Sequence, residues 1–408
     1  MIFRLAARLT ALLAIGLGAA IAVAAPAGPY GVWRVSFDQH PGGPVPFTLE
    51  LRAGKTGPVA VLVNAPERVR AEQVSVAGET VTLTFPSYNS RLVLTHGSDD
   101  RLTGAATVLR SVGTVTLPAT GVRGNWRFSP QPASAAGNVS GRWVVEYGDG
   151  KVRGIANLKQ VGSLVSGSVQ LPSGDMRYLS GELSGKQLRL STFDGSFTNL
   201  WTATLDGGAL RGAQFAATSR PAGTAWTARR EKNADMAAVA VEKPGGERLS
   251  FRLPDGTGGF VSLSDARYKG KVVVISIGGA WCPNCHDEAM YLGPYASRRR
   301  AEGLEMIGLQ FEYGTDQARA FRQMASFKSR YKLPYPMVYG GQPVPEDTIK
   351  VLGALGPVKV YPSTIFIGRD GLVKEVHVGW SGPATGALNV KAKREFDETV
   401  SRLLKQRA

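Results

Sequence analysis

The first half of the chain alternates apolar and polar residues over short runs. Between residues 30 and 230, segments such as 47–51, 80–84 and 187–191 place every second side chain on one face. This alternation predicts strands that each bury one face. Glycine-rich turns separate the runs, and we find no long helical pattern among them. We therefore expect mainly antiparallel β structure in this region.

A weak repeat divides this β region into two blocks. Residues 31–35 (GVWRV) open the first block, and residues 141–145 (GRWVV) open the second. The repeat predicts two β domains, at residues 28–130 and 138–230, each folded as a small antiparallel barrel or sandwich. Three roles are open for these domains: capture of a partner or ligand, spacing, and association of chains into a homo-oligomer.

The pattern changes after residues 231–247, which we interpret as a linker. Residues 271–277 form an uninterrupted apolar run, as in a buried parallel strand. The elements that follow are a helix starting at residue 282, a strand at 306–311, a helix at 316–330, a hairpin turning at 369–371 and a final helix at 391–405. This is the thioredoxin order. The predicted fold class is therefore an α/β thioredoxin-like C-terminal domain, residues 248–408, preceded by mainly antiparallel β domains.

The N-terminus and the charge balance add a location and a class of partner. Residues 1–25 combine Arg4 and Arg8 with an apolar run and end in a small-x-small pattern, which predicts a cleaved signal peptide. An uncleaved membrane anchor is the alternative. The formal net charge is +16, with basic residues scattered along the chain. We expect no nucleic-acid partner, because basic and aromatic residues do not interleave, and the charge favours anionic surfaces or acidic proteins.

The chain contains two cysteines, Cys282 and Cys285. An exported protein that uses cysteines as structural cross-links would spread them more widely, so this close pair indicates redox chemistry. At a helix N-terminus the backbone N–H groups and the helix dipole favour a thiolate. We expect Cys282 to be the exposed nucleophile and Cys285, one turn along, to be the resolving thiol of a redox-active disulfide.

Two further features accompany the cysteine pair. Glu288 lies three residues after Cys285 on the same side of the helix, so burial near the sulfurs should raise its pKa and make it a candidate proton carrier. The structural alternative is a carboxylate that complements the helix dipole. Tyr361-Pro362 precedes a strand, and its peptide bond could be cis. In a thioredoxin fold such a proline lies against the dithiol. The expected substrate-binding residues are Trp281, Pro283, Asn284, Tyr361 and Pro362.

The C-terminal half resembles the TlpA/ResA-like family of periplasmic thiol–disulfide oxidoreductases, within the thioredoxin superfamily. Residues 281–288 (WCPNCHDE) and the Tyr361-Pro362 pair carry this resemblance. It implies a periplasmic reductant of a specific partner protein, of the cytochrome c maturation or copper-chaperone type, supplied with electrons by a membrane dithiol protein and needing no cofactor. Gly278 stands where the family usually has a tryptophan, which predicts open space beside the site.

Other functions stay open at this stage. A disulfide oxidase or isomerase would use the same thiols. A peroxiredoxin-like peroxidase is an alternative enzyme, although residues 277–282 lack the proline and threonine of its motif. Cys282, Cys285 and His286 also match the pattern of c-type haem attachment. A partner-binding module is a further alternative. We expect no metal, because two cysteines and four dispersed histidines do not give a familiar ligand spacing.

Overall fold

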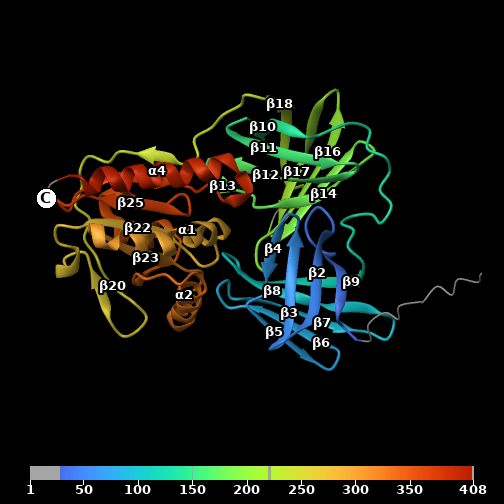
Figure 1. The fold of residues 1–408 in the computed structure, drawn as a ribbon, viewed down its shortest axis with the longest axis horizontal. Coiled ribbons are helices and arrows are strands. Elements are labelled where there is room, and N and C mark those ends of the chain that lie inside the picture. The colour runs from blue at the N-terminus through green and yellow to red at the C-terminus, as the bar shows by residue number, and fades with distance from the viewer. Residues whose placement is uncertain (1–27, 149, 219–221, 407–408) are drawn as a thin grey trace, which may run out of the picture.

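The computed structural model of the protein describes residues 28–148, 150–218 and 222–406. The predicted signal peptide, residues 1–25, lies outside the described residues. Two antiparallel β-sheets form the first half of the chain, and an α/β part packs beside them (Figure 1). Within the described ranges, we find no helix with the length and apolar character needed to span a membrane.

The first sheet has nine strands in the order β4-β3-β2-β1-β9-β8-β7-β6-β5. Alternate residues of its strands, such as Trp33, Val35 and Phe37, are fully buried in one core. That core also receives Phe193 and Phe215 from the second sheet, so the two sheets are packed together. The strands are β1 (Gly31–Phe37), β2 (Val45–Gly54), β3 (Gly57–Asn64), β4 (Glu67–Arg70), β5 (Gln73–Ala77), β6 (Thr80–Phe85), β7 (Ser90–His96), β8 (Arg101–Arg110) and β9 (Gly113–Arg123).

The second sheet closes on itself. Its order is β11-β10-β18-β17-β16-β15-β14-β12-β13, and an additional pairing between β11 and β12 joins its ends. We call this closed sheet the barrel. Its strands are β10 (Gly141–Tyr147), β11 (Val152–Val161), β12 (Leu164–Leu171), β13 (Gly174–Asp175), β14 (Leu179–Ser184), β15 (Gln187–Phe193), β16 (Thr198–Asp206), β17 (Ala209–Ala216) and β18 (Thr224–Arg230). The expectation of mainly antiparallel β structure is confirmed.

The weak sequence repeat corresponds to two copies of one arrangement. Trp33 in β1 donates its indole N–H to Pro29 O at 2.8 Å, and Trp143 in β10 donates to Val139 O at 2.8 Å. An arginine from the last strand of each sheet lies over the indole. Arg123 is 3.9 Å from the Trp33 ring centroid, and the matching residue of the barrel is 4.4 Å from that of Trp143. The two repeated tryptophans therefore make equivalent contacts in the two sheets.

The C-terminal part is built on a six-stranded sheet in the order β19-β26-β25-β22-β23-β24. β22 runs parallel to β23 and antiparallel to β25. Its strands are β19 (Ala240–Glu242), β22 (Val272–Gly278), β23 (Leu304–Phe311), β24 (Met337–Gly341), β25 (Ser363–Ile367) and β26 (Val373–Val378). The helices are α1 (Pro283–Arg299), α2 (Gln317–Tyr331), α3 (Pro345–Leu352) and α4 (Ala387–Leu404). The predicted thioredoxin-like fold is confirmed by this order.

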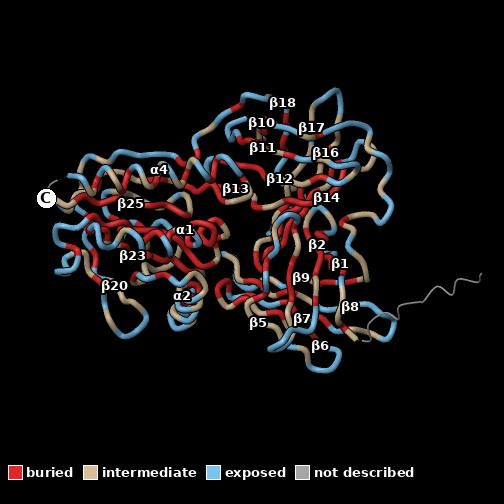
Figure 2. Tube along the Cα trace, viewed as in Figure 1, coloured by how far each residue is buried: buried red, intermediate tan, exposed pale blue. Residues whose placement is uncertain are grey.

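Both faces of β22 are covered, which explains its uninterrupted apolar sequence. Val272 and Val274 face a core shared with α1, α2 and α4. Val273 and Ile275 face a second core shared with α3 and a small hairpin, β20 (Arg252–Pro254) and β21 (Phe260–Ser262). Figure 2 shows the resulting continuous burial along the central strands and α1. The sequence patterns did not reveal β24 and α3, and part of the predicted linker forms the edge strand β19.

Candidate active site

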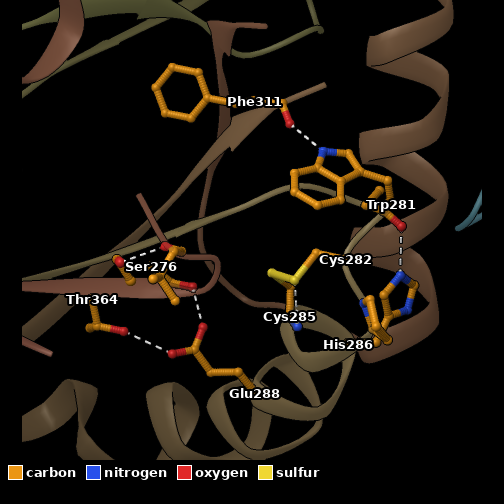
Figure 3. Close-up of a disulfide and its surroundings, with 12 residues drawn as sticks. Ser276, Trp281, Cys282, Cys285, His286, Glu288, Phe311 and Thr364 are labelled. Carbon is orange, nitrogen blue, oxygen red and sulfur yellow. Dashed lines mark hydrogen bonds between the residues drawn. A yellow bond between two sulfur atoms is a disulfide. The ribbon is translucent and has the colours of Figure 1, made fainter. Parts of the chain in front are cut away.

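The cysteine pair lies where the buried strand β22 passes into α1. Cys282 is the N-cap of the helix and Pro283 is its first residue, a position where the missing N–H of proline costs nothing. Cys282 and Cys285 form a disulfide. The Cys282 sulfur accepts a hydrogen bond from the backbone N–H of Cys285 at 3.2 Å (Figure 3). The predicted start of the helix at the motif is confirmed.

The expectation that Cys282 is exposed is wrong. Its exposed fraction is 3%, and that of Cys285 is 4%. Beside Cys282, the barrel packs against the two residues between the cysteines. Arg177 donates to the Pro283 carbonyl at 3.2 Å. The Asn284 amide, in the orientation that satisfies both groups, accepts from the Asp175 N–H at 3.0 Å and donates to the Asp175 carbonyl at 3.3 Å. Asn284, expected to contact substrate, therefore faces the barrel.

Glu288 points from α1 toward the sheet (Figure 3). Its carboxylate accepts one hydrogen bond from the Ser276 hydroxyl and one from the Thr364 hydroxyl, each 2.8 Å long. Burial raises the pKa of Glu288 to about 7, and the two hydroxyls oppose that rise only partly. The pKa therefore moves in the predicted direction. The dipole alternative loses support, because the first helical turn contains no acidic residue.

A second buried carboxyl, Glu312, follows the end of β23 and escaped the sequence analysis. It accepts the Ala280 N–H at 2.7 Å, while the adjacent Phe311 carbonyl accepts the Trp281 indole N–H at 2.9 Å. These two contacts hold the turn that leads into Cys282. Burial raises the pKa of Glu312 to about 8. An isolated acid directly after an apolar parallel strand, at the edge where ligands of α/β sheets bind, is a usable sequence signal.

His286 is enclosed beside the dithiol. One ring nitrogen contacts the Ala280 carbonyl and the other contacts the Tyr331 hydroxyl, each at 2.7 Å. Tyr88, from the turn between β6 and β7, stacks on the ring with centroids 3.8 Å apart. Burial holds the pKa of His286 well below its usual value, so the ring is neutral. Both nitrogens are engaged in hydrogen bonds and both cysteines are joined to each other, and this arrangement does not favour haem attachment.

One buried arginine joins both β-sheets to the helix of the dithiol. Arg177, between β13 and β14, lies 2.9 Å from the Asp287 carboxylate of α1 and 3.2 Å from that of Asp194. It also pairs with Glu67 of β4. Burial raises the pKa of Asp287 to about 7; Arg177 opposes this rise, whereas Asp175 adds to it. The sequence offered no hint of this cluster, since its members are far apart along the chain.

An aromatic rim borders the open side of the site. The Trp281 ring stacks on Tyr313 at 4.5 Å and meets the Tyr361 ring edge-on at 5.2 Å. All three side chains are half-buried. The Tyr361-Pro362 bond is cis, as the sequence suggested. The expected substrate contacts Trp281, Tyr361 and Pro362 are thus brought together at one side of the dithiol.

The space predicted at Gly278 is absent. A Cβ atom there would lie 3.3 Å from both the Cys285 sulfur and the Gln310 amide nitrogen. The glycine therefore allows Gln310 and Cys285 to pack against the end of β22, and these side chains occupy the place of the larger residue.

The C-terminal part of the chain is similar in sequence to known proteins. A sequence model of the AhpC/TSA family matches residues 244–376. Over 136 residues the chain is 30% identical to the thiol-disulfide oxidoreductase ResA of Bacillus anthracis, covering 33% of this chain and 69% of that protein. The chain belongs to the ResA-like family of thiol-disulfide oxidoreductases. The predicted enzyme class, an oxidoreductase, is thereby confirmed.

Two further proteins to which the chain is similar are more distant. The thiol:disulfide interchange protein DsbE of Escherichia coli is 26% identical over 143 residues, covering 35% of this chain and 68% of that protein. The crystal structure of a DsbF homologue from Corynebacterium diphtheriae is 21% identical in sequence, with a TM-score of 0.31. The match covers 43% of this chain and 97% of the DsbF homologue. In this ResA-like protein two β-sheets precede the matched region, and the barrel contacts the cysteine motif itself.

Proposed function

We propose that the protein is an exported thiol–disulfide oxidoreductase that reduces a disulfide of one specific partner protein. The observation that carries this proposal is the position of Cys282 as the N-cap of α1, with its sulfur 3.2 Å from the Cys285 N–H. In the reduced state this donor and the helix N-terminus would stabilise a Cys282 thiolate. A stabilised thiolate at the first cysteine is what attack on a partner disulfide requires.

The proposed reaction has two exchange steps. The Cys282 thiolate attacks one sulfur of the partner disulfide, forms a mixed disulfide and releases the other partner sulfur as a thiolate. The Cys285 thiolate then attacks the Cys282 sulfur and releases the second partner thiolate. Two electrons have passed to the partner, and the Cys282–Cys285 disulfide is left. A membrane dithiol protein would restore the reduced state by the same exchange in reverse.

Glu288 supplies the proton chemistry of the second step in this proposal. It lies one helical turn from Cys285, and its carboxyl is buried with a pKa of about 7. A carboxyl with this pKa can accept the Cys285 proton near neutral pH as that thiol becomes the attacking thiolate. Its lack of a cationic partner among the described residues keeps it available for that exchange.

The family supports the remaining parts of the proposal. We infer a partner of the apocytochrome c or copper-chaperone type and a periplasmic location after cleavage of residues 1–25. The half-buried Trp281 and Tyr361, with Pro283 and Pro362, would contact the partner around its disulfide. Asn284 would join them only after the barrel moves away. The β-sheets would capture the partner or associate two copies of the chain.

Trapping separates the roles of the two cysteines. Reduced Cys285→Ser should accumulate a mixed disulfide with the partner through Cys282, whereas Cys282→Ser should accumulate little. Equal trapping by both variants would contradict the assignment. The direction is tested by the reduction potential of the full chain. A value near that of thioredoxin, about −270 mV, fits a reductant, whereas one near about −120 mV would contradict the proposal.

A further inference from the structure

A cleft with a volume of about 590 Å³ separates the first sheet from α2. Figure 1 shows α2 and the strands β5 to β8 facing each other across the middle of the molecule. Residues from β6 to β9 line one wall, and one face of α2 lines the other. The cleft therefore exists only because the first sheet is docked beside the thioredoxin-like domain.

The charge of the cleft has one sign. Its lining includes Arg91 from β7 and Arg319 and Arg322 from α2, and no aspartate or glutamate of the described ranges lines it. Arg91 and Arg322 are exposed, and neither side chain forms an ion pair within the part of the chain that the structure describes. Guanidinium groups gathered in a concave surface attract carboxylates and hold them with paired hydrogen bonds.

A buried donor in the same cleft also lacks an acceptor. Gln323 lines the cleft and is 3% exposed. Its amide oxygen accepts from Arg319, but its amide nitrogen has no hydrogen-bond partner among the described residues. Leaving such a donor buried and unpaired costs about 1 to 3 kcal/mol. The unpaired Gln323 amide is a second feature of the cleft, independent of the surface charge, that favours binding of a hydrogen-bond acceptor.

The cleft adjoins the open side of the dithiol. Arg319 donates to the Tyr313 carbonyl, and the Tyr313 ring stacks on Trp281, the residue before Cys282. The opposite side is closed, because Asn284 is paired with the barrel. A polypeptide that reaches the sulfurs is therefore expected to approach from the Trp281 side, which Tyr313 and Arg319 connect to the cleft.

We propose that this cleft binds an acidic segment of the partner protein, next to the partner's disulfide in sequence. Carboxylates of the segment pair with Arg91 and Arg322, and a carbonyl or carboxylate oxygen accepts from Gln323. The inference deepens the proposed function and rests on it for the redox step. It names the substrate class: disulfide-bearing proteins with a run of acidic residues beside the reactive cystine.

Synthetic peptides test the cleft without knowledge of the partner. Three peptides of equal length would carry one disulfide flanked by Asp and Glu, by Asn and Gln, or by Lys. At low salt, the reduced full-length protein should reduce the acidic peptide about tenfold faster than the neutral one, and the difference should shrink in 0.5 M NaCl. The double variant R91E/R322E should lose this preference and favour the Lys peptide.

A matched variant and a small substrate are the controls. K186E/R211E makes the same change in net charge at two exposed residues of the barrel and should keep the acidic preference. All three proteins should reduce neutral hydroxyethyl disulfide at the same rate. If the unchanged protein fails with hydroxyethyl disulfide, the proposed redox function fails. Binding of Cys-to-Ser peptides still tests the cleft in that case: equal affinity for acidic and neutral versions, or an unchanged preference in R91E/R322E, would overturn it.

Discussion

Two consecutive residues of α1, Asp287 and Glu288, meet opposite surroundings. Burial raises the pKa of each to about 7. Asp287 faces the β-sheets and is held 2.9 Å from the guanidinium of Arg177. Glu288 faces the central sheet, and among the described residues it receives hydrogen bonds only from the Ser276 and Thr364 hydroxyls. A similar pKa thus arises with a buried cation on one side of the helix and without one on the other.

This difference separates an anchoring carboxylate from one that can exchange a proton. Arg177 lies among several buried carboxylates that come from three parts of the fold, so removing any partner leaves an unpaired buried charge. Glu288 has no counter-ion in the part of the chain that the structure describes, and its hydroxyl partners can rotate to suit either protonation state. We therefore expect changes at Arg177 to alter stability and domain docking, and changes at Glu288 to alter pH dependence.

The largest effect is expected from Arg177→Met. This variant leaves Asp287, Asp194 and Glu67 buried without their cation, which should lower the free energy of unfolding by about 3 to 5 kcal/mol at pH 7. Chemical denaturation of the oxidised protein measures this. The loss should shrink at pH 5, as the raised pKa of Asp287 lets that carboxyl take up a proton. In the reduced variant, Cys282 should also be alkylated faster, because the barrel no longer holds the motif.

Arg229→Met is the control for Arg177→Met. Arg229 pairs with Glu146 at 2.9 Å on the surface, where the arginine side chain is 57% exposed. An exposed pair of this kind contributes at most about 1 kcal/mol. Equal losses in the two variants would mean that the Arg177 cluster does not hold the sheets to α1.

Glu288→Gln should make the oxidised protein more stable at alkaline pH. The pKa of Glu288 rises from 4.5 to about 7 on folding, so the native state binds the proton more tightly than the unfolded chain. The contribution of Glu288 is therefore lost as pH rises from about 4.5 to 7. At pH 8 the variant should gain about 3 kcal/mol, and at pH 4 the two proteins should be nearly equal. Because the pKa of Glu312 is about 8, the stability of both proteins should still fall somewhat as pH rises.

The same substitution should slow the resolving step about a hundredfold, since an amide cannot carry the Cys285 proton. The rate of disulfide exchange followed from pH 5 to 9 should show an inflection near pH 7 in the unchanged protein and none in Glu288→Gln. Asp287→Asn is the matched variant, one residue away with a similar pKa. It should keep the inflection. Loss of the inflection in Asp287→Asn alone would reverse the two roles.

The features that the sequence predicted are local ones. The apolar run of β22, the cysteine spacing and the position of Glu288 are each set by neighbouring residues, so patterns of period and spacing reveal them. Arg177 and Tyr88 lie in turns more than a hundred residues before α1 and carry no local mark of their role. The wrong expectation of an exposed Cys282 has the same origin, because local spacing cannot show which distant parts of the chain, such as the barrel, pack around the motif.

The smallest effect is expected from Tyr88→Phe, which tests how far the Arg177 cluster extends. The Tyr88 hydroxyl donates to the Asp194 carboxylate at 2.8 Å, and its ring stacks on His286. Phenylalanine keeps the stacking and removes one hydrogen bond to a charged group. The free energy of unfolding should therefore fall by about 1 to 2 kcal/mol. Reduction of hydroxyethyl disulfide should not change. If stability is unaffected, Arg177 and the backbone N–H groups of Ser196 and Phe197 are enough to satisfy Asp194, and the cluster ends at the arginine. A loss as large as that of Arg177→Met would instead make Tyr88 an equal part of the cluster.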